Sequence, residues 1–114
     1  MAAFEDLEVW QRGVDLSVDV YLALSDSREF GFKDQITRSG LSIPSNIAEG
    51  MERRTMPDKI KFLEYARGSS GEFRTQALVG KKAGFVDNDK ATEWIQDSRK
   101  LSAMLQGLIR SLQT

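Results

Sequence analysis

Apolar residues recur at intervals of three and four along almost the whole chain, and the alternation typical of strands is nearly absent. A chain with this period buries its apolar side chains as helices, so the pattern predicts an all-α fold. The 114 residues leave room for one domain, which we expect to span residues 1–114. We expect four helices, at residues 6–24, 33–52, 55–83 and 88–112.

The second predicted helix contains a proline. Pro44 removes one backbone donor and presses its ring on the carbonyl group four residues earlier, at Gly40. Because apolar residues continue on one face on both sides of Pro44, we expect one kinked but continuous helix. We expect a turn before this helix, at Phe30-Gly31-Phe32.

Polar residues and a glycine mark the ends of the last two predicted helices. Thr55 is followed by Pro57 and Asp58, a pattern typical of a capped helix start. Gly84 suits a left-handed C-cap, and Asp87 offers the N-cap of the fourth helix.

The first predicted helix has two apolar stripes instead of one. One stripe holds Leu7, Trp10, Val14, Val18 and Tyr21, and the other holds Val9, Gly13, Leu16, Val20 and Leu24. Only a narrow ridge is charged, and it holds Glu8, Arg12, Asp15, Asp19 and Asp26. The apolar arc is wider than the ~100° that a small bundle requires, which indicates a further burial partner, and we expect another copy of the chain. We predict the subunit contact at Val9, Leu16, Val20 and Leu24.

A row of polar residues lies opposite the apolar stripe of the second predicted helix. It consists of Arg38, Ser42, Ser45, Asn46 and Glu49. Small polar side chains favour a close, hydrogen-bonded contact between helices. The alternative is a small enzyme site, with Glu49 as the base and Arg38 as the holder of an anion. Because no nucleophile or metal ligand accompanies Glu49, we predict no catalytic residue, no cofactor and no metal.

The composition narrows the chemistry further. The chain has no His and no Cys, which removes the commonest general base, the commonest metal ligand and all thiolate chemistry. No apolar run approaches the ~18 residues of a membrane span, and the first residues lack the apolar core of a signal peptide. We therefore expect a cytoplasmic protein with no membrane partner.

Charge is unevenly distributed along the chain. Residues 1–30 hold seven acidic and two basic residues, a net charge of −5, whereas residues 31–84 hold six acidic and ten basic, a net charge of +4. Residues 85–114 hold four of each sign. Basic side chains can bind the phosphates of nucleic acid, although charges on a helix more often form a solvated face. The candidates for such binding are Arg53, Arg54, Lys59, Lys61, Lys81 and Lys82.

Several runs resemble the four-helix-bundle family encoded by intervening sequences of bacterial 23S ribosomal RNA genes. The most specific run is Ser-Ile-Pro-Ser-Asn-Ile-Ala-Glu-Gly at residues 42–50, and residues 4–11 and 35–39 accompany it. The match continues at Phe62-Leu63, Tyr65-Ala66, Gly68-Ser69, Glu72 and Gly84-Phe85. The resemblance implies an antiparallel up-down bundle that assembles into a ring-like homopentamer, with no known enzymatic activity. A related branch, the accessory proteins of diversity-generating retroelements, is strongly basic and works with nucleic acid and a reverse transcriptase, whereas this chain has an isoelectric point near 5.5.

We therefore expect a non-enzymatic, self-assembling four-helix-bundle protein whose partner is itself. Two alternatives stay open. One is a nucleic-acid or ribosome-associated accessory protein that binds phosphates through its basic residues, and the other is the small enzyme described above.

Overall fold

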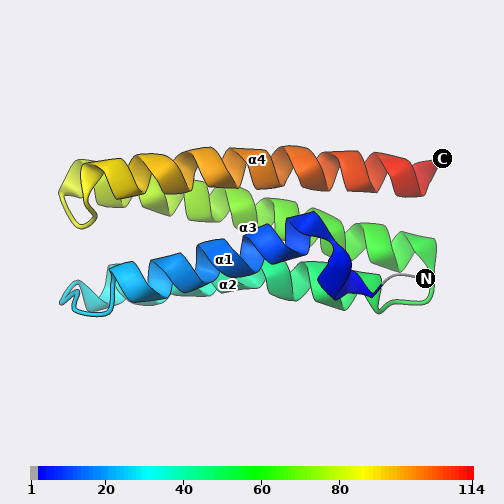
Figure 1. Ribbon diagram of the computed structural model, residues 1–114, viewed down its shortest axis with the longest axis horizontal. Coiled ribbons are helices and arrows are strands. Elements are labelled where there is room, and N and C mark those ends of the chain that lie inside the picture. The colour runs from blue at the N-terminus through cyan, green and yellow to red at the C-terminus, as the bar shows by residue number, and fades with distance from the viewer. Residues whose placement is uncertain (1–2) are drawn as a thin grey trace.

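The computed structural model describes residues 3–114 and contains, over these residues, four α-helices, one short 3-10 helix and no strand (Figure 1). The elements are η1 at Phe4–Asp6, α1 at Glu8–Ala23, α2 at Phe30–Met51, α3 at Met56–Ala83 and α4 at Asn88–Gln113. The predicted all-α class with four helices is confirmed.

Each helix runs antiparallel to its neighbour in the sequence, and together they form a rod of 43 × 20 × 19 Å (Figure 1). Both α1 and α3 pack against α2 and α4. With 16 residues against 28, α1 is roughly 24 Å long and α3 roughly 42 Å. η1 packs on α1 and α2 near the end of the rod that α1 does not reach. Over residues 3–114, no helix combines the length and the apolar character needed to cross a membrane.

The start of α2 differs from the prediction. The expected turn at Phe30-Gly31-Phe32 is wrong, because these residues form the first turn of the helix. The ring of Phe32 packs against Phe85, with ring centroids 5.4 Å apart, and closely approaches Gly80 of α3. This tertiary contact holds the first turn of α2 against the neighbouring chain segments.

Pro44 lies inside α2 and does not end it, so the predicted continuous helix is confirmed. The proline also faces α1, where a Cβ added to Gly13 would lie 3.4 Å from the Pro44 side chain. A Cβ added to Gly40 would lie 3.4 Å from the ring of Phe73. The two glycines therefore let α2 approach both α1 and α3 closely.

The predicted caps of α3 and α4 are confirmed. The backbone N–H of Asp58 donates to Thr55 Oγ1 at 3.3 Å, and the N–H of Lys90 donates to Asp87 Oδ2 at 3.0 Å. Gly84 adopts a left-handed conformation, with φ of 78°, at the end of α3. These local bonds satisfy backbone groups that the helix ends leave free.

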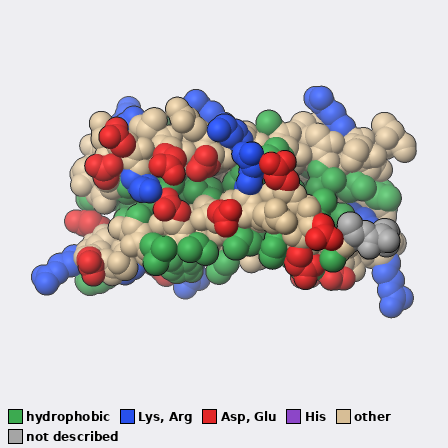
Figure 2. All heavy atoms as spheres, viewed as in Figure 1, with side chains coloured by type: hydrophobic (Ala, Val, Ile, Leu, Met, Phe, Trp, Pro, Cys, Tyr) green, Lys and Arg blue, Asp and Glu red, His purple; other side chains and the backbone are tan. Residues whose placement is uncertain are grey.

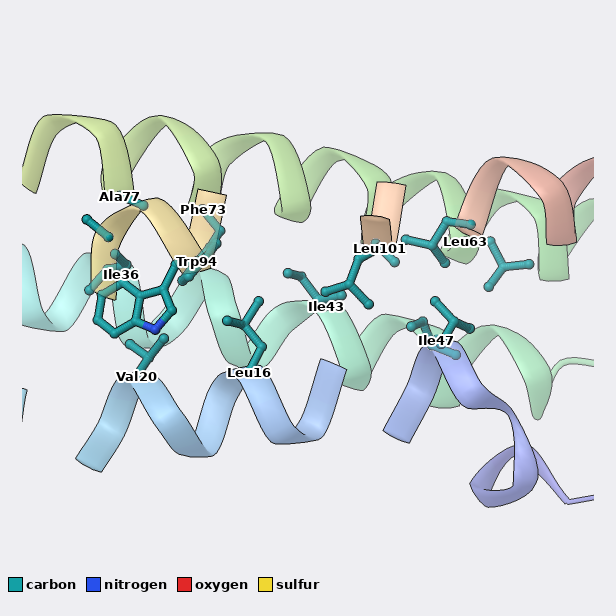
Figure 3. Packing of buried hydrophobic residues seen from close by; sticks show 14 of the residues in the cluster. Leu16, Val20, Ile36, Ile43, Ile47, Leu63, Phe73, Ala77, Trp94 and Leu101 are labelled. Atoms are coloured by element: carbon teal, nitrogen blue, oxygen red, sulfur yellow. The ribbon is translucent and has the colours of Figure 1, made fainter. Parts of the chain in front are cut away.

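Buried side chains from all four helices form one hydrophobic cluster (Figure 3). Trp94 is fully buried in it, and its ring centroid lies 6.1 Å from that of Phe73. Figure 3 shows Trp94 between Ile36 of α2 and Val20 of α1. The other largest fully buried side chains are those of Ile43, Ile47, Leu63, Leu101 and Leu105.

Gly50 and Gly107 offer a matched test of this close packing. A Cβ at Gly50 would lie 3.0 Å from Phe62 Cβ and 3.1 Å from the carbonyl oxygen of Lys59, whereas a Cβ at Gly107 would meet no atom within 4 Å. We expect Gly50→Ala to lower the free energy of unfolding by about 1–3 kcal/mol, because α2 and α3 must move apart. Gly107→Ala should raise it by about 0.5–1 kcal/mol, because alanine favours the helix. Urea unfolding followed by circular dichroism measures both, and a Gly50→Ala variant as stable as Gly107→Ala would contradict the prediction.

Candidate interaction surfaces

The predicted subunit stripe of α1 lies in the core of the chain itself. Val9, Leu16, Val20 and Leu24 are at most 5% exposed and belong to the shared hydrophobic cluster. Because α1 packs against both α2 and α4, this stripe is buried between two neighbours without a second chain. The structure thus corrects the predicted contact, since buried side chains cannot face another subunit.

The other stripe of α1 remains on the surface. Val18 is 50% exposed and Tyr21 is 46% exposed, while Trp10 and Val14 are half-buried. On α2, Leu41 is 46% exposed. We call these five residues the α1/α2 apolar face. Figure 2 shows hydrophobic side chains gathered along the lower edge of α1.

Leu41 belongs to this face because of the register between the two helices. It precedes Pro44 by three residues, and Pro44 packs on Gly13 of α1. Residues three apart share one side of a helix, so Leu41 lies on the side of α2 next to α1. Because α1 and α2 run antiparallel and Gly13 meets Pro44, the residues that follow Gly13 in α1 lie beside those that precede Pro44 in α2. Val18 and Leu41 are therefore at a similar height along the pair.

A groove of about 300 Å³ separates α1 from α4 and is mostly acidic. Its lining consists of Arg12, Asp15, Leu16, Asp19, Glu93, Asp97 and Leu101. Figure 2 shows acidic side chains along this junction. The charged ridge of the first helix therefore faces α4. Among residues 3–114, no group of three or more His, Cys, Asp or Glu side chains is placed to hold a metal ion.

Asp19 makes two polar contacts that join α1 to α4 at this groove. Trp94 Nε1 donates to Asp19 Oδ2 at 2.7 Å, and Lys90 Nζ donates to Asp19 Oδ1 at 3.3 Å. The hydrogen bond to Asp19, together with the charge of that carboxylate, raises the pKa of Lys90. The carboxylate of Asp19 therefore has a cation beside it, and the buried indole has its acceptor.

The polar row of α2 divides between the α3 contact and solvent. The hydroxyl oxygens of Ser42 and Ser69 lie 2.7 Å apart across the two helices. Asn46 Nδ2 donates to both Ser42 Oγ and the Ser42 carbonyl oxygen at 2.9 Å. Ser45 is exposed. Ser42 thus takes part in a close helix contact of the predicted kind, Asn46 supports it from within α2, and Ser45 faces solvent.

Arg38 and Glu49 belong to separate ion pairs. Arg38 Nε donates to Asp34 Oδ1 at 3.1 Å, and Glu49 accepts from Arg53. Eleven residues along one helix place Arg38 and Glu49 roughly 16 Å apart. The structure therefore does not bring the two residues of the alternative enzyme site together.

The six predicted phosphate-binding residues do not form one surface. Arg53, Arg54, Lys59 and Lys61 lie around the junction of α2 and α3, whereas Lys81 and Lys82 lie in the last turn of α3. The twenty residues from Lys61 to Lys81 span roughly 30 Å of helix. Three of the six also contact groups within the chain, and one of these, Lys61, has its Nζ atom 5.5 Å from the centroid of the Phe62 ring.

Arg53 lies over the ring of Phe62, with its guanidinium carbon 4.4 Å from the ring centroid. Lys59 Nζ donates to the carbonyl oxygen of Met51 at 2.9 Å. These bonds close the α2–α3 connection, so both cations are already engaged in packing.

A network of serines and one arginine joins α3 to α4. Ser70 Oγ donates to the carbonyl oxygen of Ser98 at 2.8 Å and accepts from Ser102 Oγ at 2.9 Å. Arg74 Nε donates to Ser98 Oγ at 3.0 Å, and Arg74 Nη2 donates to Ser102 Oγ at 2.7 Å. The helical period places these serines on inner faces, but the sequence carries no signal for which residue bonds to which.

The contact between Asp19 and Trp94 can be tested by substitution. Asp19→Ala would leave the indole N–H of a fully buried Trp94 without its acceptor, so we expect the free energy of unfolding to fall by about 1–3 kcal/mol. The control is Asp15→Ala, an exposed acidic residue of the same groove, which should change it by less than about 0.5 kcal/mol. Thermal unfolding followed by tryptophan fluorescence measures both variants. Equal effects of the two substitutions would count against this role of Asp19.

Comparisons with known proteins agree with this fold. A solved structure of a protein of unknown function from the S23 ribosomal protein family of Bacteroides thetaiotaomicron VPI-5482 superposes with a TM-score of 0.83. The two chains are 22% identical, and the match covers 89% of this chain and 97% of that one. No curated protein matches the chain. The family model described as 23S rRNA-intervening sequence protein matches residues 5–107. Because this match spans most of the sequence, the chain belongs to the 23S rRNA-intervening sequence protein family.

Proposed function

We propose that this protein is a non-enzymatic, self-assembling four-helix bundle whose copies associate through the α1/α2 apolar face. The observation that carries the proposal is the exposure of Val18, Tyr21 and Leu41 on two adjacent helices. Scattered exposed apolar residues are ordinary on a protein surface, but apolar residues gathered on neighbouring helices favour a binding partner.

The dimensions of the bundle suit such a contact. One long side of the rod measures 43 × 20 Å. A side of this size is close to the ~800 Å² that each partner buries in a standard protein interface. Association of two bundles side by side can therefore bury enough surface without any change of fold.

The expected occupant of the face is another copy of the same chain. The family resemblance implies a ring-like homopentamer, and a closed ring requires that the face of one copy meets a different surface of the next copy. The number of copies in this proposal comes from the family resemblance alone.

The polar side chains support a structural role over a catalytic one. Ser42, Ser70 and Asp19 make hydrogen bonds that join helices to each other. Glu49, the one base considered for catalysis, pairs with Arg53 on its own helix. A cytoplasmic location, as expected from the sequence, is part of the same proposal.

Sedimentation equilibrium tests the assembly. We expect the wild-type protein to have a mass several times that of the 12.8 kDa chain. The double substitution Val18→Glu with Tyr21→Glu should give a helical monomer, because it places charge on the apolar face without entering the core. The helix content, measured by circular dichroism, should stay unchanged.

Two control variants make this test specific. Val79→Glu changes a residue of α3 that is exposed to the same degree but lies outside the α1/α2 apolar face, so it should dissociate the assembly only if α3 supplies the second surface of the ring contact. Leu16→Glu changes the buried stripe and should unfold the chain instead of dissociating it. A wild-type protein that sediments as a monomer at micromolar concentration would rule the proposal out.

A further inference from the structure

The second groove of α4 has the opposite charge from the first. Here α3 and α4 border an open groove of about 430 Å³, lined by Glu64, Arg67, Gly68, Gly71, Arg74 and Ser102. A third arginine, Arg99, lies close enough to Arg74 to influence its ionisation. The lining of the groove thus holds two arginines and one carboxylate, and Arg99 adds positive charge near Arg74.

Arg67 holds a donor that has no partner. Its Nη1 group donates to Glu64 Oε1 at 2.7 Å. Its Nε atom is buried and, over residues 3–114, makes no hydrogen bond to the protein. Because Nε is buried, the part of Arg67 that an anion in the groove can reach is the exposed end of its guanidinium group, and the whole side chain is 39% exposed.

Arg74 is held in place by neutral groups alone. Its bonds go to the hydroxyl groups of Ser98 and Ser102 and to the carbonyl oxygen of Ser98. Within the described part of the chain, residues 3–114, it forms no ion pair. Burial, and then the charge of Arg99, lowers the pKa of Arg74. Both effects mean that this positive charge is poorly compensated, so an anion beside it would be stabilised.

Gly68 and Gly71 have no packing role that explains them. A Cβ at either position would meet no atom within 4 Å, unlike one at Gly13, Gly40 or Gly50. A glycine inside a helix lowers the stability of the helix relative to alanine. In the structure, these two glycines leave open space on the surface of α3 between Arg67 and Arg74.

We propose that the α3/α4 groove binds a phosphate group between the guanidinium groups of Arg67 and Arg74, with Gly68 and Gly71 leaving the space for it. The two arginines are seven residues apart, so they lie on one side of α3, separated by roughly 10.5 Å along its axis. Long side chains at this spacing can approach one small anion from both ends. This proposal does not rest on self-association of the chain.

The chemistry of the two arginines favours phosphate over a carboxylate. Over residues 3–114, Arg74 Nη1 and Arg67 Nη2 make no hydrogen bond to the protein, and the oxygens of a phosphate group face enough directions to accept from both nitrogens at once. Free phosphate and the phosphate of a nucleoside monophosphate share this feature. A long polyanion is disfavoured, because the chain has a net charge of −1 and carries an acidic groove on the other side of α4.

The test follows the Nε–Hε signals of the arginines by nuclear magnetic resonance. The ¹⁵N-labelled full-length protein is titrated with inorganic phosphate, and separately with a nucleoside 5′-monophosphate, at ionic strength held constant with sodium chloride. We expect saturable shifts of the Arg67 and Arg74 signals. Equal affinity for both probes would assign the site to free phosphate, and tighter binding of the nucleotide would assign it to a phosphate monoester; both results support the proposal.

Matched variants separate a phosphate site from general charge effects. Arg67→Gln should weaken binding about tenfold or more. Gly71→Leu should abolish it by filling open space, whereas Gly107→Leu, also at an unhindered helix glycine but outside this groove, should bind as the wild type does. Circular dichroism verifies that each variant is folded. Shifts that do not saturate, that chloride reproduces, or that Arg67→Gln and Gly71→Leu leave unchanged would overturn the proposal.

Discussion

The close packing of α3 against both neighbours depends on side chains too small to hold the helices apart. Gly40 and Gly50 bring α2 to within contact of the aromatic residues on α3, and Ser42 bonds directly to Ser69. On the α4 side, the hydroxyl of Ser70 reaches the backbone of the neighbouring helix. Only because these contacts are short do Phe73 and Trp94 meet and fill the space that all four helices share. Ser42, Ser69 and Ser70 at the same contacts make hydrogen bonds across the helices, which offsets the cost of burying their hydroxyl groups.

Local signals in the sequence predict the ends of α3 and α4 correctly. Thr55, Gly84 and Asp87 act on backbone groups a few residues away, and such geometry is written in the sequence itself. The start of α2 could not be predicted in this way, because it depends on a contact between Phe32 and Phe85. Residues far apart in the chain leave no local pattern for such a contact.

The surfaces were predictable only in part, and α1 shows the physical reason. The period of a helix gives the angle between two apolar stripes, and the excess of apolar surface on α1 could be recognised from that angle. The period does not show which of the two stripes faces the centre of the bundle. The packing of α1 on α2 and α4 decides this, and it buries Val20 and exposes Val18. The prediction of one basic surface was wrong for a related reason. Lys61 and Lys81 belong to the same basic part of the sequence, but α3 is one long helix that places them near its opposite ends.

Opposite charge on the two sides of α4 bears on how copies of the bundle can meet. Two copies that approach each other with the same groove bring like charges together, whether the groove is that of Asp15 and Asp97 or that of Arg67 and Arg74. Contacts between unlike grooves are attractive instead. This distribution of charge favours contacts between different surfaces, which are the contacts that the ring proposed above would require.

The order of the helices around the bundle also has a kinetic consequence. Three of the four helix contacts join helices that follow each other in the chain, and each of them closes only a short loop. Contacts of this kind form early and make a helical protein fold fast. The contact between α1 and α4 is different, since Asp19 and Trp94 are 75 residues apart. On these grounds we expect the α1–α4 contact to form last during folding and to open first in the native state, so that amide hydrogens of α1 exchange with solvent before those in the middle of α3.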